Sequence, residues 1–237
     1  MRCAVLRRGE AMLPALAMLP LGFASAADVQ GGPAPAGMPY PTPGEATATT
    51  DFEGPPKHRT GIALGLSLGF GVGAATGYPN NSEEIGTPAD YSASGTMLGS
   101  GSTLLIMGAL ADYLNFGLWF GRTAFKGESW RSSGGGAGLR VELFPLTTLY
   151  PSLDGLGIFG QFGLGSANLT STVPGVLEAS GTQSFAATGL FYEWSVTKVF
   201  GGHFGLGPAL EYDAIWSLPF ERHDLLAALR VVFYGGP

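Results

Sequence analysis

The segment from Gly61 to Gly73 alternates strictly between large apolar and very small residues. The large residues are Ile62, Leu64, Leu66, Leu68, Phe70 and Val72, and only Gly, Ala and Ser stand between them. Period-two alternation predicts a β-strand with two different faces. Glycine and serine on the inner face suit the crowded interior of a narrow closed barrel, whereas a continuous apolar outer face suits lipid. The chain is therefore expected to cross a membrane with strands.

Seven further segments continue this pattern. The eight expected strands are 62–72, 102–111, 114–125, 134–144, 156–167, 185–199, 203–216 and 222–234. Each is long enough to supply the roughly 9–11 residues that a tilted membrane strand needs. The second departs from strict alternation between Leu104 and Met107, and Pro208 is expected to mark a bulge. We predict an all-β fold, an eight-stranded antiparallel up-and-down transmembrane β-barrel, because closure leaves no unpaired strand edge in lipid.

The chain before residue 60 has a different composition. A basic start at Arg2, Arg7 and Arg8 precedes an apolar run and Ala24-Ser25-Ala26, which predicts a signal peptide over 1–26. Residues 27–59 are rich in Pro, Ala and Thr and are expected to form a flexible linker, so the barrel domain spans 60–237. Cys3, the single cysteine, would leave with the signal, which excludes cysteine chemistry in the mature protein.

The connections between the expected strands differ in length. A long polar loop, Thr76–Gly101, follows the first strand, a second covers Asn168–Gln183, and Gly201-Gly202 makes a tight turn. Membrane barrels of bacteria have short periplasmic turns and longer external loops. This order predicts a chain that starts in the periplasm, with its linker there, and crosses the bacterial outer membrane eight times.

With its leader ASA, its alternating segments and its aromatic end RVVFY, the chain resembles the small eight-stranded outer-membrane barrels of the OmpA/OmpX-like class. The resemblance is architectural and covers about Thr60 to Tyr234. It implies insertion by the barrel-assembly machinery, a monomer, and a lipid environment that includes lipopolysaccharide.

Several ionisable residues have the inward phase. They are Arg140, Glu142, Glu193, Glu211, Asp213 and Arg230. An isolated buried charge costs several kcal/mol, so these side chains are expected to pair with one another. The favoured interpretation is a salt-bridge network that fills the lumen. A gate that admits ions or small solutes is the alternative, and a catalytic carboxylate pair is disfavoured because no nucleophile accompanies it.

Motifs for chemistry are missing from the sequence. It has no Walker loop, GxSxG or HExxH string, no metal-ligand spacing, and histidines only at His58, His203 and His223. Small-barrel lipid A deacylases use a His and a Ser on one strand, but Leu225 stands two places after His223. We therefore expect no enzyme activity, no cofactor and no metal. The net charge of −6 argues against nucleic acid as a partner.

The external side carries two candidate binding features. Basic residues expected at the outer lipid boundary are Arg122, Lys126, Arg131 and Arg222, and these could contact lipopolysaccharide phosphates. The first external loop could bind a surface partner through Tyr78, Glu83, Glu84, Asp90 and Tyr91. The expected function is thus a non-enzymatic outer-membrane barrel with an envelope role and possible loop-mediated binding. A narrow gated, porin-like channel is the first alternative and a lipid-modifying enzyme the second.

A soluble barrel and a helical membrane protein fit the sequence less well. A soluble lipocalin-like binder would carry apolar residues inside and polar residues outside, and here the arrangement is inverted. Helical spans would need about 20 apolar residues each, and no run after the leader reaches that length.

Overall fold

The computed structural model of the protein describes residues 59–176, 178–199 and 201–236, and the predicted signal peptide and most of the predicted linker lie outside them. The strands are β1 (Gly61–Gly77), β2 (Ser92–Ala111), β3 (Leu114–Lys126), β4 (Trp130–Leu143), β5 (Leu156–Ser171), β6 (Ala179–Tyr192), β7 (Trp194–Val199), β8 (Gly202–Trp216) and β9 (Phe220–Gly235). Two short 3-10 helices, η1 (Pro88–Asp90) and η2 (Pro151–Leu153), lie in connections.

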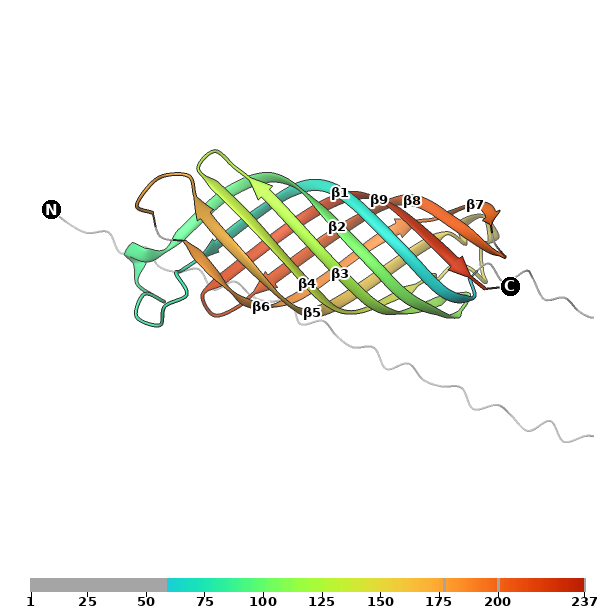
Figure 1. Ribbon diagram of the computed structural model, residues 1–237. Helices are drawn as coiled ribbons and strands as arrows, with labels where there is room; N and C mark the ends of the chain where they lie inside the picture. Colours follow the sequence, from blue (N-terminus) through green and yellow to red (C-terminus); the bar gives the residue numbers. More distant parts are fainter. Residues whose placement is uncertain (1–58, 177, 200, 237) are drawn as a thin grey trace, which may run out of the picture. The chain divides into compact units, whose positions relative to one another are not determined.

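The strands form one closed antiparallel barrel. Each strand from β1 to β5 pairs with the next, β1 pairs with β9, and β9 pairs with β8. β6 and β7 pair with successive parts of β8, so the nine strand segments make eight crossings of the wall. Figure 1 shows the strands inclined to the barrel axis, with the β1–β2 loop at one end and the chain's C-terminus at the other. We call these the loop end and the turn end.

The wall is interrupted once, between β6 and β7. The ladder of β6 with β8 ends at the pair Phe191 and Ala209, and β7 resumes it at Trp194 and Leu206. Pro208 lies opposite this gap, while its ladder with β9 continues without a shift. Proline has no N–H to donate, which favours a break at this point. The irregularity predicted at Pro208 thus lies opposite it, in the gap between β6 and β7, and not in β8 itself.

Large apolar side chains cover the outside of the barrel. In β1, the side chains of Ile62, Leu64, Leu66, Leu68, Phe70 and Val72 are all at least 40% exposed. β2 follows the same rule, because Leu104 and Ile106 are exposed, whereas Leu105 and Met107 are buried in the lumen. The side chains therefore alternate between the two faces here as in a regular strand. The sequence did not show this because all four residues are apolar, and only the structure shows which two face inward.

Several strands extend further toward the loop end than the sequence predicted. β2 starts at Ser92 and not at residue 102, because Ser92–Gly101 pairs with the end of β1. β4 and β5 are likewise longer, and the β3–β4 connection shrinks to residues 127–129. The predicted loops Thr76–Gly101 and Asn168–Gln183 were therefore too long. These strand ends are polar, so they lack the hydropathy alternation on which the prediction relied.

Glycines on the inner face of β4 and β5 allow these two strands to approach closely. A Cβ added at Gly163 would lie 2.8 Å from the Cα of Gly138 and would overlap the carbonyl of Ala137, whereas one added at Gly160 would meet nothing within 4 Å. We expect Gly163→Ala to lower the free energy of unfolding by about 1–3 kcal/mol through overpacking. Urea titration of the folded fraction measures this, with Gly160→Ala as the matched control. Equal losses in both variants would contradict the close-approach argument.

Candidate functional site

The centre of the lumen holds a carboxylate with two cationic partners. Glu142, fully buried on β4, accepts a hydrogen bond from Arg140 Nε at 2.8 Å and from Arg230 Nη2 at 2.7 Å. Arg230 Nη1 donates a further bond to the same carboxylate, and Asn115 Nδ2 donates another at 3.1 Å. Both oxygens of Glu142 are thus occupied. Two guanidinium groups carry two positive charges and Glu142 carries one negative charge. Further acids nearby are therefore needed to balance the charge.

Those further acids lie on either side of the central carboxylate. Glu193 stands in the gap between β6 and β7, with Oε2 at 3.6 Å from Arg230 Nη2, and accepts a hydrogen bond from the Tyr234 hydroxyl at 3.1 Å. Glu211 joins through Gln161, whose amide donates to Glu211 at 2.9 Å and accepts from Arg140 at 2.7 Å. The structure therefore brings together five of the six ionisable residues that the sequence placed inside. We call this set, with Asn115, Gln161 and Tyr234, the inner network.

Arg59 closes the inner network at the turn end. Its side chain is 4% exposed, lies 3.6 Å above the Phe144 ring and sits 3.7 Å from Glu193. It also donates hydrogen bonds to the backbone carbonyls of Asp112 at 3.4 Å and Asp154 at 3.0 Å. The sequence assigned this residue to the linker and gave no sign that it would reach the barrel. One side chain thus links two connections at this end to the lumen.

A second ionic cluster lies nearer the loop end. Arg222, predicted to contact lipopolysaccharide at the outer rim, is fully buried and sits 2.9 Å from the Asp224 carboxylate. Its guanidinium also donates to the hydroxyls of Ser132, at 3.2 Å, and Thr123. The prediction for Arg222 is therefore wrong, because β9 turns its even-numbered polar residues inward and its odd-numbered residues outward. Asp213 faces Asp224 across the β8–β9 ladder and is also buried.

Apolar side chains fill the space around both ionic clusters. One buried group surrounds the inner network: Leu105, Met107, Trp119, Phe144, Phe159, Phe185, Phe191 and Val232 are among its members. The Trp119 and Phe185 rings lie 4.5 Å apart, and the Arg140 guanidinium lies 3.6 Å above the Phe159 ring. A second group, with Met97, Phe125, Leu169, Phe220 and Leu226, occupies the loop end. The lumen of the described barrel is therefore packed with side chains along much of its length.

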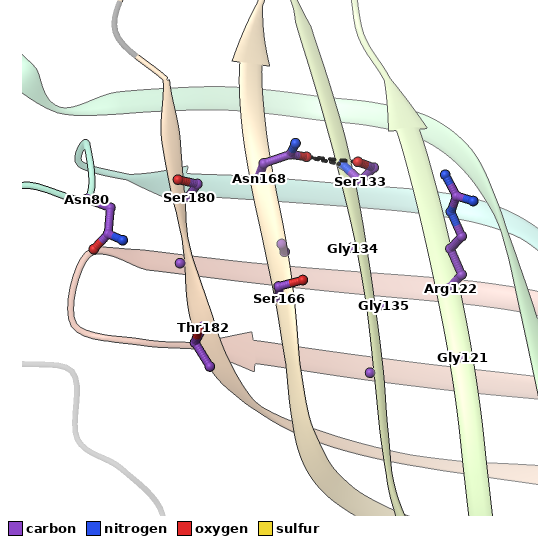
Figure 2. Close-up of a pocket in the computed structure, with 13 residues that line it drawn as sticks. Asn80, Gly121, Arg122, Ser133, Gly134, Gly135, Ser166, Asn168, Ser180 and Thr182 are labelled. Atoms are coloured by element: carbon purple, nitrogen blue, oxygen red, sulfur yellow. Dashed lines mark hydrogen bonds between the residues drawn. The ribbon is translucent and has the colours of Figure 1, made fainter.

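A large hollow opens on the outside of the wall, because the polar side chains that line it have the outward phase of their strands. It has a volume of about 660 Å³, and its lining residues come from β3 to β6 near the loop end and from Asn80 in the β1–β2 loop (Figure 2). Its outward-pointing polar side chains are Arg122, Ser133, Ser166, Asn168, Ser180 and Thr182. Asn168 accepts hydrogen bonds from the backbone N–H and the hydroxyl of Ser133, at 3.1 and 2.8 Å. We call this hollow the wall notch.

The three other predicted outer-rim residues do lie on the outside. Arg122, Lys126 and Arg131 are exposed, and Lys126 is directly paired with Arg131 across β3 and β4. Both line a second hollow of about 610 Å³, which shares Ser133 and Asn168 with the wall notch. The cations are thus gathered on one side of the barrel.

The predicted binding loop is ordered by short local contacts. The Tyr78 and Tyr91 rings lie 5.2 Å apart, and the Tyr78 N–H donates to the Pro219 carbonyl at 2.7 Å. Glu83 is exposed in a turn, where its N–H donates to the Asn81 side chain at 3.3 Å, while Glu84 and Asp90 are half-buried. The five predicted residues thus belong to one loop, but its two tyrosines contact each other across the loop base.

His223 lies on the outer face of β9 near the loop end. One ring nitrogen is 2.7 Å from the Tyr212 hydroxyl, and the other is 2.7 Å from Glu221 Oε1. These contacts pair three polar groups with one another on the outer face of the wall. Among the described residues, no group of three or more His, Cys, Asp or Glu side chains is arranged to hold a metal ion. In the same part of the chain, no helix has the length and apolar character to cross a membrane.

A closed antiparallel barrel with an apolar exterior and a charged, paired interior defines the class of transmembrane β-barrels. No protein-family model and no curated protein matches this sequence. Among solved structures, the chain is similar to Ail, the attachment invasion locus protein of Yersinia pestis, at 8% identity and a TM-score of 0.45, over 73% of this chain and 99% of that one. It is also similar to Neisserial surface protein A, at 14% identity and a TM-score of 0.43, over 73% and 97%. A third is the N-terminal β-barrel domain of Pseudomonas aeruginosa OprF, at 14% identity and a TM-score of 0.38, over 74% and 98%.

Proposed function

We propose that this chain is a non-conducting, non-enzymatic barrel of the bacterial outer membrane, with an envelope role and its loop end facing outward. The observation that carries the proposal is the filled lumen. The inner network, Arg59 and two groups of buried apolar side chains occupy the space that a pore would need. Eight-stranded barrels have an interior just wide enough for side chains to fill, which agrees with this packing.

The first external loop supports a further part of the proposal, which is binding to a partner at the cell surface. This loop, residues 78–91, is the longest connection between successive strands of the described barrel. Its Tyr91 and Glu83 side chains are exposed. Aromatic side chains on loops that a rigid scaffold holds are common binding residues. Deleting residues 80–89 should abolish partner capture and leave the barrel folded.

Planar-bilayer recording tests the non-conducting state. We expect the folded full chain to give no stable conductance steps in 1 M KCl, because the two buried apolar groups and the inner network fill the lumen of the described barrel along much of its length. Arg59→Ala removes the side chain that covers Glu193 at the turn end and should give brief, small openings at most. Long-lived steps in the unaltered protein would favour the alternative function, a narrow ion channel gated by its lumen charges.

A further inference from the structure

The outer wall of the barrel has two sides of unequal apolar height. On β1 the outward residues are apolar from Ile62 to Val72, whereas on β4 the apolar outward run covers only Ala137 to Leu143. At about 3.3 Å per residue and a tilt of about 45°, these runs span roughly 25 Å and 16 Å of membrane. Outer-membrane barrels carry an apolar band about 25 Å tall. The β4 side is therefore short of apolar wall by roughly 10 Å.

The wall notch occupies the missing part of this band. Next to the outward apolar residues Phe120, Ala137 and Leu164 of β3 to β5, the following outward positions on β3 to β6 form one row across the ladder: Arg122, Gly135, Ser166 and Thr182. The next row contains Ser133, Asn168 and Ser180. Hydroxyl and amide groups that face hydrocarbon cost free energy unless they find hydrogen-bond partners. Lipid tails at this height would leave most of these groups unpaired, so a polar occupant fits better.

Charge determines which kind of occupant fits. Arg122 lines the notch, and Lys126 and Arg131 edge the adjoining hollow toward the loop end. None of the residues that line the two hollows is acidic. Guanidinium and ammonium groups bind phosphate through charge-assisted hydrogen bonds, and serine, threonine and asparagine suit sugar hydroxyls. The chemistry is that of a phosphorylated saccharide, and the position on a lipid-facing wall points to one that carries acyl chains.

We propose that the wall notch binds the phosphorylated sugar headgroup of an outer-leaflet glycolipid. Arg122, Lys126 and Arg131 contact its phosphates, while Ser133, Ser166 and Asn168 contact its sugar. The acyl chains then lie along the apolar part of β3 to β5, below the notch. The inference rests on the proposed orientation of the barrel, because only the outer leaflet of that membrane presents such headgroups at the loop end.

Lipid binding to the full chain in detergent micelles tests the proposal. The probes are lipid A with both phosphates, lipid A with its phosphates removed, and inorganic phosphate, each followed by native mass spectrometry. We expect phosphorylated lipid A to bind, and dephosphorylated lipid A and free phosphate to bind far more weakly. Replacing the three cations together, Arg122→Ala with Lys126→Ala and Arg131→Ala, should weaken binding about 100-fold, because each basic side chain near a membrane surface contributes about a factor of five.

Two further variants separate the notch from general surface charge. Asn168→Leu with Ser133→Leu fills the notch with apolar side chains while keeping all three cations, and it should also weaken binding. His223→Ala changes an exposed residue on β9, outside the notch, and should leave binding unchanged. The mobility of unboiled samples on a gel shows whether each variant is folded.

Three outcomes would overturn the inference. Equal binding of phosphorylated and dephosphorylated lipid A would exclude recognition of phosphate, and equal binding by the triple variant would exclude these cations. Dimers in analytical ultracentrifugation that the two leucine substitutions abolish would identify a second copy of the chain as the occupant. The non-conducting state is measured separately in bilayers, so its failure would not be confused with any of these results.

Discussion

Glu142→Gln is expected to lower the free energy of unfolding by about 3–5 kcal/mol, since it removes the carboxylate that accepts hydrogen bonds from two buried guanidinium groups. Glu142 is fully buried, and Arg140 and Arg230 both donate to it. The amide keeps the size of the side chain, so the loss reports charge and not a cavity. Glu193 and Glu211 remain, but they lie at the edges of the inner network and cannot replace a carboxylate at its centre.

Urea titration in lipid vesicles, with the folded fraction read from unboiled gels, measures this loss. The matched control is Glu83→Gln, an exposed glutamate of the first loop, which should change stability by less than about 0.5 kcal/mol. Arg230→Ala should also destabilise the barrel, and the double variant should cost less than the sum because the two residues interact directly. A loss below about 1 kcal/mol for Glu142→Gln would show that the buried charges are not held by this pairing.

Trp119→Ala should lower the free energy of unfolding by about 3–5 kcal/mol, through the cavity that it leaves in the middle of the lumen. The indole is 1% exposed, packs on Phe185 and donates from Nε1 to the Phe162 carbonyl at 3.3 Å. Its neighbours belong to the rigid wall, so they cannot move far to fill the space. Bilayer recordings of this variant should show more frequent openings than those of the unaltered chain.

Phe120→Ala, one residue further along β3, provides the comparison. Phe120 points outward and is 43% exposed, so lipid or detergent fills the space when its ring is removed. We expect a loss below about 1.5 kcal/mol, since transfer from one apolar medium to another leaves no cavity. If Phe120→Ala were the more damaging of the two, the assignment of inward and outward faces on β3 would be reversed.

The sequence predicted the outer face of the barrel well because one physical constraint acts on all of it. Lipid surrounds every strand, so positions such as Leu66, Leu118 and Leu229 repeat with period two wherever the wall crosses the membrane. The same constraint ends where the membrane ends. Strand pairing continues beyond it, as in Ser92–Gly101, with polar residues that carry no alternation signal. The predicted loops were too long for this reason.

The lumen was predicted in outline and missed in detail. Parity along each strand gave Arg140, Glu142, Glu193 and Glu211 as inward, and the structure places their side chains in the lumen. The same parity on β9 could have placed Arg222 inside, since Leu225 and Leu229 fix the odd-numbered residues as outward. The alternation along β3 and β5 could also have placed the uncharged residues Asn115 and Gln161 inside. Nothing in these residue types, however, indicates that they would hydrogen-bond to the buried charged groups.

Other features depend on the closed structure and had no local signal. Arg59 follows a segment rich in proline, and its contacts with Phe144 and Glu193 join residues about 85 and 134 positions apart. The wall notch similarly requires that β3 to β6 lie side by side in a fixed register, because each strand contributes only one or two of its polar residues. Sequence reasoning found its cations but not the hydroxyl and amide groups between them.

The central claim is a closed barrel with lipid outside and packed charges inside, and a comparison of boiled and unboiled samples tests it most directly. The full chain, refolded in detergent micelles, should migrate differently before and after boiling and should give a β-type far-UV circular dichroism spectrum. Identical migration together with a helical spectrum, or folding in plain buffer without detergent, would contradict the claim.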